Sequence, residues 1–411
     1  MSSVCFYFQV HQPYRLRRFS YFDSSRELNY FDEEANAIVF RKVAEKSYLP
    51  TNKVLLDLIK RFRGRFRFAF SLSGIVVEQM QRYAPDVLAS FQELVATGSV
   101  EILGETYHHT LASIYDEHEF CEQVMRHDEL MKFIFGAEPK VFRNTELIYD
   151  DRIGEMVASL RYRGIIAEGA DDILNGRTPN KVYKNPYSGL PILAKNYALS
   201  DDIAFRFSNV NWKGYPLTPE KFAYSLHSVT DSAHVVNLFM DYETFGEHQW
   251  SSSGIFSFLN EMPSAVLSDR RWNFLTPSEV INCYAPVEAL PYKRLTSWAD
   301  KNRDLSAWLG NRIQRAALQE IVALAPHIRK IDDPHITTVW RRLQTSDHFY
   351  YMCTSGSEDG DVHAYFSPYQ SPYDAFIRYM NVLKDFKWWV FQRSAEMGDV
   401  DQNRGVLRIH Y

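Results

Sequence analysis

The stretch VVNLFMDYETFGEH, residues 235–248, joins a strand-like segment to a cluster of ionisable side chains. Its first six residues are strand formers, and carboxylate and imidazole groups follow within eight positions: Asp241, Glu243, Glu247 and His248. The stretch KVFRNTE, residues 140–146, repeats the arrangement, because a short β-like run that contains Arg143 ends in Glu146. Buried strands that end in ionisable side chains are typical of active sites in barrel-type α/β folds. These stretches predict parallel strands with active-site side chains at their carboxyl ends.

Strand-like and helix-like segments alternate through the first 285 residues. Alternation at this spacing predicts a parallel sheet with crossover helices. Thr51, and Asp150 or Asp151, are the expected helix N-caps. Residues 171–215, rich in Asn, Pro, Gly and Tyr, are expected to be mainly loop with room for an inserted hairpin. The strand-like segments are 4–10, 65–72, 100–103, 141–142, 164–168 and 235–240, and the helix-like segments are 51–62, 85–95, 119–135 and 153–160.

The pattern changes near residue 285, where long helical runs replace the alternation. These runs cover residues 305–324 and 374–393. We therefore expect two domains. The first, residues 1–285, is a catalytic barrel, and the second, residues 286–411, is a mainly helical domain that packs on the barrel and helps to close the cleft.

The composition is typical of a folded protein, and the net charge does not indicate a polyanionic partner. The 411 residues are 45% hydrophobic and 15% aromatic, which allows a large core. The formal charge of −5 arises from 46 basic and 51 acidic residues, so neither nucleic acid nor a membrane is an expected partner. No secretory signal or apolar stretch of membrane-spanning length is visible, which makes the cytoplasm the expected location. The cysteines lack a CxxC pair and predict neither a zinc site nor a disulfide framework.

Five segments follow one another along the chain: HQP at 11–13, EILGETYHH at 101–109, FRNTE at 142–146, DYETFGEH at 241–248, and SW at 297–298 through RDLSAW at 303–308. Together they resemble the motifs of glycoside hydrolase family 57, which includes α-amylases, 4-α-glucanotransferases and branching enzymes. HQP is weak evidence alone, whereas the third and fourth motifs, each ending a strand, are specific. Residues 366–380 also resemble the end of the family's α-amylase branch. The resemblance covers nearly the whole chain and implies a distorted (β/α)7 barrel followed by helices.

The resemblance further implies a retaining mechanism on the α-1,4-glucosidic bonds of maltodextrin, starch or glycogen, without a metal or cofactor. Glu146 matches the family's nucleophile and Asp241 its general acid/base. Independently of the name, such chemistry needs one ionised carboxylate and one protonated acid, about 5–5.5 Å apart. We expect Arg143 to favour an ionised Glu146, while burial and Glu243 raise the pKa of Asp241.

Polar side chains near these carboxylates are candidate substrate contacts. The resemblance implies that His11 and His109 donate hydrogen bonds to sugar hydroxyls. Glu243 is expected to hold substrate hydroxyls, to tune Asp241, or to form a structural ion pair. The full set of expected substrate-binding residues is His11, His109, Arg143, Glu243, His248 and Trp298.

The remaining candidates carry structural alternatives. His248 either contacts substrate or supports the fourth-motif loop. Trp298 is expected on the first helical segment after the barrel, where its indole would stack on a glucose ring, whereas Trp308 is expected to pack between helix and barrel. Two residues depart from the family pattern: His108 stands where an aromatic residue is expected, and Asn302 stands where an acidic residue is expected. The first leaves open which imidazole faces the cleft, and the second concerns substrate preference.

Three other functions stay open at this point. A transferase would form the same intermediate but let a sugar hydroxyl intercept it in place of water. A metal-dependent polysaccharide deacetylase would share a related barrel, but Asp171-Asp172 and His108-His109 are doublets without the spacing of its metal ligands. A catalytically idle glycan-binding protein would keep the fold without turnover, and the presence of both catalytic carboxylates argues against it.

Overall fold

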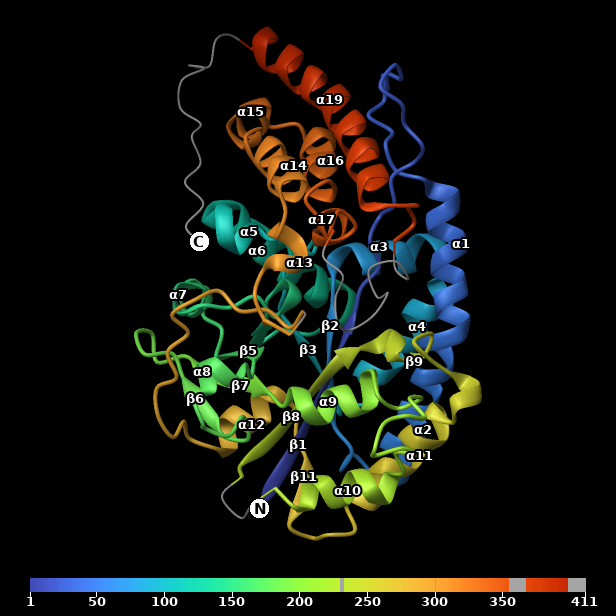
Figure 1. Ribbon diagram of the computed structural model, residues 1–411, viewed down its shortest axis with the longest axis vertical. Coiled ribbons are helices and arrows are strands. Elements are labelled where there is room, and N and C mark those ends of the chain that lie inside the picture. The colour runs from blue at the N-terminus through green and yellow to red at the C-terminus, as the bar shows by residue number, and fades with distance from the viewer. Residues whose placement is uncertain (230–232, 300, 355–366, 398–411) are drawn as a thin grey trace.

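Seven parallel strands form a barrel in the computed structural model, which describes residues 1–229, 233–299, 301–354 and 367–397. Their order around the barrel is β3, β2, β1, β8, β7, β5 and β4. The predicted (β/α)7 barrel, followed by a helical region, is confirmed (Figure 1). The strands are β1 Ser2–Val10, β2 Phe68–Leu72, β3 Val100–Leu103, β4 Val141–Arg143, β5 Gly164–Glu168, β7 Pro191–Lys195 and β8 Val235–Asp241.

Gly104 closes the barrel between β3 and β4. Its amide donates to the carbonyl of Val141 at 3.0 Å, and its carbonyl accepts from the amide of Arg143 at 2.8 Å. A Cβ at this position would lie 2.1 Å from the hydroxyl of Tyr162, so the seam requires glycine. Because β3 and β4 meet here, residues 105–109 lie beside residues 143–146.

Helices cover the outside of the barrel and continue after it. In Figure 1 the helices that follow residue 300 gather at the top, at one end of the barrel. Within the described ranges, none of the helices has the length and apolar character needed to cross a bilayer. The helices along the barrel are α1 Glu33–Val43, α2 Leu49–Phe62, α3 Gly74–Tyr83, α4 Pro85–Ala96, α5 Ala112–Tyr115, α6 Glu117–Phe135, α7 Asp151–Ser159, α8 Asp171–Leu174, α9 Tyr197–Ala204, α10 Pro219–His227, α11 Ile255–Val266 and α12 Pro277–Cys283.

The helices after the barrel and the minor strands complete the fold. Strand β6 pairs antiparallel with β7, β11 pairs with β1, and β9 and β10 pair with each other. Of the predicted helical domain, residues 300, 355–366 and 398–411 lie outside the described residues. The later helices are α13 Ser306–Leu309, α14 Arg312–Val322, α15 Ala325–Ile331, α16 Pro334–Arg342, α17 Ser346–Tyr350 and α19 Pro372–Glu396, and the minor strands are β6 Val182–Lys184, β9 Phe245–Gly246, β10 Gln249–Trp250 and β11 Trp272–Phe274.

Several local predictions need correction. Thr51 is not an N-cap, because a π-helical turn at Ala44–Tyr48 joins α1 to α2 and places Thr51 inside the helix, where its hydroxyl donates to the carbonyl of Ser47. The helical run 305–324 is two helices, since Asn311 caps α14 through the amide of Gln314. The segment 171–215 does contain the expected hairpin, but its second strand, β7, is also an integral strand of the barrel.

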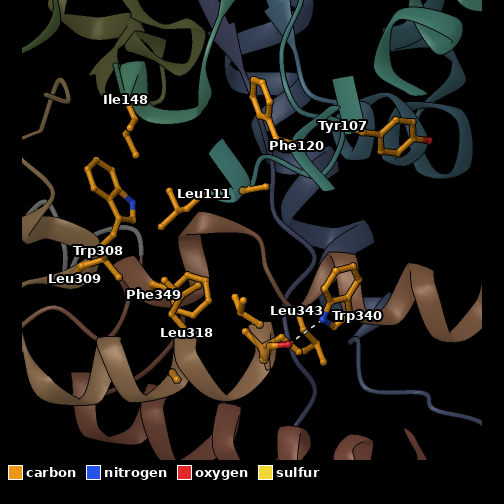
Figure 2. Close-up of a cluster of buried hydrophobic side chains, with 14 of the residues drawn as sticks. Tyr107, Leu111, Phe120, Ile148, Trp308, Leu309, Leu318, Trp340, Leu343 and Phe349 are labelled. Carbon is orange, nitrogen blue, oxygen red and sulfur yellow. Dashed lines mark hydrogen bonds between the residues drawn. The ribbon is translucent and has the colours of Figure 1, made fainter. Parts of the chain in front are cut away.

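The hydrophobic core has an inner and an outer part. Side chains that alternate along β1 divide between them: Tyr7 points into the barrel with Phe239, while Phe6 packs outward against the helices. A larger cluster joins the barrel's top loops to the helices after residue 300, and Figure 2 shows part of it, with Leu111 and Ile148 facing Trp308 and Phe349. This core crosses the predicted domain boundary near residue 285.

Candidate active site

A cavity of about 620 Å³ opens at the carboxyl ends of the barrel strands, and all eight predicted site residues line it. They come from loops that follow different strands: His11 follows β1, His109 follows β3, Glu146 follows β4, and Asp241 ends β8. Since parallel strands bring their carboxyl ends to one edge, residues distant in sequence meet there. The eight are His11, His109, Arg143, Glu146, Asp241, Glu243, His248 and Trp298.

Glu146 projects into the cavity from a tight turn directly after β4. Its backbone adopts φ 56° and ψ 24°, a left-handed conformation that is uncommon for a residue with a side chain. Such strain persists only where surrounding contacts enforce it, and it concentrates at functional sites. The Glu146 carboxylate accepts hydrogen bonds from Trp298 Nε1 at 2.8 Å and from the Ser346 hydroxyl at 2.9 Å. The carboxylate is therefore fixed in one orientation.

The electrostatic surroundings of Glu146 favour its ionised form. Burial alone would raise its pKa, but the hydrogen bond and positive charge of His109 and the charge of Arg143 hold the pKa below its usual value. His109 Nε2 lies 3.3 Å from Glu146 Oε1, and His109 Nδ1 lies 3.6 Å from Glu105 Oε2. Although burial lowers it, the pKa of His109 rises to about 9 because of these two carboxylates. His109 is thus an imidazolium between two anions at neutral pH.

His11 stacks on His109 and connects the site to the later helices. The two imidazole centroids are 3.9 Å apart, with an angle of 21° between the ring planes. His11 Nδ1 lies 2.8 Å from the Ser73 hydroxyl, and His11 Nε2 lies 2.9 Å from Asp347 Oδ2 in α17. Burial and the charge of His109 lower the pKa of His11, so the stacked pair holds one positive charge.

Asp241 has the opposite electrostatic environment from Glu146. Burial raises its pKa well above the usual value, and the negative charges of Glu243 and Glu146 add to the effect, against Arg143 and Lys195. Asp241 therefore holds its proton under conditions in which Glu146 has lost its own. The expected directions of the two pKa shifts agree with these environments, while the catalytic roles of Glu146 and Asp241 stay a prediction.

Glu243 lies in the 3-10 turn Tyr242–Thr244, which directly follows Asp241 and strand β8. It accepts hydrogen bonds from the Tyr48 hydroxyl and from Gln12 Nε2, the latter at 3.2 Å. Burial raises the pKa of Glu243 to about 7 despite these donors. Glu243 lines the cavity, and its negative charge contributes to the raised pKa of Asp241.

Arg143 provides a buried positive charge beneath the two carboxylates. Its guanidinium is fully buried, lies over the ring of Phe239 at 5.1 Å, and is 3.6 Å from Glu105 Oε2. None of its three guanidinium nitrogens has a hydrogen-bond partner among the described residues. Arg143 therefore acts on Glu146 and Asp241 through its charge, which lowers the pKa of both carboxyl groups.

Trp298 lies in a loop before α13, not on a helix as predicted. Its indole donates to Glu146, packs edge-on against Phe239 with centroids 5.3 Å apart, and has Lys195 Nζ over its ring at 5.3 Å. The Arg303 guanidinium donates to the Trp298 carbonyl. Trp298 thus orients the carboxylate of Glu146 from the wall of the cavity, a contact that the sequence did not reveal.

The residues that depart from the family pattern lie away from the cavity. His108 is buried against Tyr107, with ring centroids 4.7 Å apart, and does not line the cavity, so His109 is the imidazole that faces it. Asn302 is exposed, and its backbone carbonyl accepts from Arg294 at 3.4 Å.

Trp308 is 1% exposed and belongs to the large core cluster, as predicted, although it also borders the cavity.

His248 lines the cavity at the end of the fourth motif. Its backbone amide donates to the carbonyl of Glu243 at 2.9 Å, and burial lowers the pKa of its imidazole to about 4. A neutral imidazole at this place can both donate and accept a hydrogen bond. Either predicted role, contact with substrate or support of the loop, is compatible with this position.

Sequence reasoning missed residues that the helical region supplies. Ser346 and Asp347 begin α17 and reach Glu146 and His11, about 200 and 336 positions away in sequence. They lie in the stretch TSDHFYY, residues 345–351, which does not follow a strand-like run, so the pattern that identified the other site residues is missing there. Glu105 stood inside the second motif and could have been named from it. Among the described residues, no group of three or more His, Cys, Asp or Glu side chains is placed to hold a metal ion.

Comparisons with known proteins agree with the motifs. The profile of "Glycosyl hydrolase family 57" matches residues 5–293. A protein of Methanocaldococcus jannaschii, provisionally named as an alpha-amylase, is 41% identical over 97% of this chain and 87% of its own length.

Solved structures with low sequence identity share the fold. A family 57 branching enzyme from Thermococcus kodakaraensis superposes with a TM-score of 0.65 at 14% identity, over 100% of this chain and 98% of its own. The 4-alpha-glucanotransferase of Thermococcus litoralis also gives a TM-score of 0.65, at 16% identity; 85% of this chain matches, and it spans 56% of the transferase. The barrel and the helices after it are therefore common to enzymes with different named activities.

Proposed function

The chain belongs to glycosyl hydrolase family 57 and is a glycoside hydrolase, and we propose that it cleaves α-1,4-glucosidic bonds of maltodextrin, starch or glycogen with retention of configuration. One observation carries the proposal: Glu146 and Asp241 line the same cavity, and their surroundings move their pKa values in opposite directions. A retaining glycosidase needs this pairing of an ionised nucleophile with a protonated acid.

In the first step, Glu146 attacks the anomeric carbon while Asp241 gives its proton to the leaving glycosidic oxygen. The carbon–oxygen bond to the leaving sugar breaks, and a covalent glycosyl ester forms on Glu146. The hydrogen bonds from Trp298 and Ser346 aim the carboxylate, and the His109 imidazolium keeps it ionised. Positioned groups of this kind lower the barrier because little reorganisation is needed during the reaction.

In the second step, the Asp241 carboxylate accepts a proton from water, and the hydroxide oxygen attacks the anomeric carbon. The ester bond to Glu146 breaks, and Asp241 recovers its proton for the next cycle. Once the charge on Glu146 is consumed in the ester, one of the negative charges that raise the pKa of Asp241 disappears. The fall in pKa is consistent with a group that serves first as acid and then as base.

The other polar residues of the cavity fit a role in holding sugar hydroxyls. Arg143 borders the cavity and would attract substrate oxygens through its positive charge, while Glu243 and His248 can accept from hydroxyls. His11, fixed by Ser73 and Asp347, faces the same space. These contacts would orient the reacting glucose unit between Glu146 and Asp241.

The proposal is tested by incubating the protein with maltoheptaose and following the products by chromatography and by NMR of the newly formed anomer. Shorter maltodextrins released first as the α-anomer are expected, and Glu146→Gln should release none. Initial release of the β-anomer would contradict retention. The absence of any cleavage, for every α-glucan offered, would contradict the proposed hydrolysis.

Transfer to a sugar acceptor is a second candidate, because the fold is shared with a glucanotransferase and a branching enzyme. The partition between water and a sugar hydroxyl depends on how well the cavity excludes water and holds an acceptor. Two aromatic side chains that line the cavity and are exposed, Phe205 and Trp250, favour acceptor binding. Products longer than the maltoheptaose supplied would identify transfer, whereas shorter products alone identify hydrolysis.

A further inference from the structure

Two exposed aromatic side chains, Phe205 and Trp250, border the cavity where it meets solvent. Trp250 is 63% exposed and Phe205 is 50% exposed. Other large hydrophobic side chains are exposed elsewhere, including Phe22 at 93% and Tyr224 at 75%. Among the described residues, however, only Phe205 and Trp250 are both exposed and part of the cavity lining. Exposure that coincides with a cavity indicates a ligand surface more strongly than exposure alone.

The backbone around these two side chains is built to hold them together. Phe205 directly follows α9, and Trp250 ends β10. Gln249 is only 6% exposed, and its side chain joins the two segments. Its Nε2 donates to the carbonyl of Ala204 at 2.8 Å, and its Oε1 accepts from the Ser208 hydroxyl. Gln249 directly precedes Trp250 in the sequence, and Ala204 directly precedes Phe205.

The loop that carries Trp250 is also fixed from its other side. Gly246 has φ 107°, and a Cβ there would lie 2.0 Å from the carbonyl oxygen of Lys46. The Ser253 hydroxyl donates to the Trp250 carbonyl at 2.7 Å. An exposed indole on a fixed backbone loses little conformational entropy on binding, which suits a permanent contact surface.

We propose that Phe205 and Trp250 form an outer subsite on which glucose units beyond the cleaved bond stack, so that the enzyme favours α-glucans long enough to reach from Asp241 to this rim. The inference rests on the proposed function and adds a preference for chain length. The apolar faces of glucose rings pack on aromatic rings. One such contact can raise the binding affinity by up to about tenfold. Chains that end inside the cavity gain nothing from the rim.

The test compares kcat/KM for maltoheptaose with kcat/KM for maltotriose in matched variants. In Trp250→Ala the ratio of the two values should fall about tenfold, and Phe205→Ala should lower it in the same direction. Trp250→Tyr, which keeps an aromatic face, should retain most of the ratio. Trp388→Ala is the control, since Trp388 is 52% exposed on α19 and does not line the cavity. It should keep the wild-type ratio.

An unchanged ratio in Trp250→Ala, in an enzyme that still hydrolyses maltoheptaose, would overturn the outer subsite and leave the proposed function intact. If the wild-type protein hydrolyses neither substrate, the proposed function fails instead, and calorimetric titration with maltoheptaose then decides the inference. Binding that weakens about tenfold in Trp250→Ala supports the subsite. Binding that is equal in the two proteins, or that neither protein shows, overturns it.

Discussion

The Glu146 carboxylate is held by side chains from three other segments of the chain. His109 comes from the loop after β3, Trp298 from the loop before α13, and Ser346 from the start of α17. His109 is in turn held by Glu105, whose pKa falls to about 2 because His109 and Arg143 outweigh the effect of burial. The charges at this residue therefore form one linked set, and changing one member should change the titration of the others.

Replacing His109 with Gln should raise the pKa of Glu146. The imidazolium stabilises the ionised carboxylate, so its loss favours the protonated form, and the acidic limb of the kcat/KM profile should move up by about one pH unit. The measurement is the pH dependence of maltoheptaose hydrolysis between pH 4 and pH 9.

The adjacent residue provides the matched control for His109. Burial and nearby arginines lower the pKa of His108 well below its usual value, so it carries no charge at neutral pH. His108→Phe should leave the acidic limb in place. An acidic limb that is the same in His109→Gln and in the wild type would show that His109 does not set the ionisation of Glu146.

Removing the Ser346 hydroxyl should slow the reaction without unfolding the protein. Hydrogen bonds to charged groups are each worth about 1.5–3 kcal/mol, so Ser346→Ala should lower kcat/KM by about tenfold or more and raise the pKa of Glu146. Ser113→Ala is the control, since the buried Ser113 hydroxyl accepts from Asn144 and not from Glu146. Equal rates in the two variants would contradict a role for Ser346 at the carboxylate.

Much of the site was predictable from local sequence, and its supports were not. His11, Glu146 and Asp241 each follow or end a strand, a pattern visible in the sequence, and all line the cavity. Ser346 and Asp347 reach the site only because α17 packs against the loop after β3, where the amide of Ser346 donates to the carbonyl of His109 at 2.9 Å. Such long-range contacts leave no periodic signal in the chain.

At the scale of elements, the barrel depends on the seam between β3 and β4. Strand-like runs predicted the other barrel strands, but β7 was hidden in the segment 171–215, which is rich in loop-forming residues and was expected to be mainly loop. The helical run 305–324 was read as continuous because its apolar spacing persists across Gly310 and Asn311, where the cap divides it. Local sequence patterns therefore predicted whether a segment is a helix or a strand better than they predicted how the segments divide and connect.

Substituting Ala for Gly104 should strain the seam. The new Cβ would meet the hydroxyl of Tyr162 at 2.1 Å, and overpacking of this kind costs about 1–3 kcal/mol. Urea denaturation should show a lower free energy of unfolding by that amount. Gly164→Ala in β5 is the matched control, since its Cβ would lie 3.4 Å from the nearest atom. Equal stability of both variants would contradict the requirement for glycine at the seam.

At the scale of the whole molecule, the barrel and the later helices share one core. The large cluster contains Phe142 and Ile165 from barrel strands together with Trp340 and Phe386 from α16 and α19. The division into domains at residue 285 stays a prediction, but the active site depends on both sides of it, because Glu146 and Ser346 lie on opposite sides. Unfolding of the helices should therefore disrupt the site as well.

Truncating Trp340 should destabilise the entire molecule in a single transition. Its indole is 1% exposed and donates to the carbonyl of Ile321 at 2.9 Å (Figure 2). Trp340→Ala should cost about 3–5 kcal/mol, and calorimetry should show one heat-absorption peak at a lower temperature. Trp388→Ala, at an exposed position, should change stability by no more than about 0.5 kcal/mol. Two separated peaks would indicate that the helices and the barrel unfold independently.

The proposed reaction depends on Glu146, which forms the covalent intermediate, and on Asp241, which resolves it. The most direct test treats Asp241→Asn with α-maltosyl fluoride, whose leaving group needs no proton, and digests the quenched protein for mass spectrometry. Because the base for the second step is missing, the glycosyl ester should accumulate. We expect a maltosyl adduct on the peptide that contains Glu146. An adduct on another residue, or none while maltose is released at the wild-type rate, would contradict it.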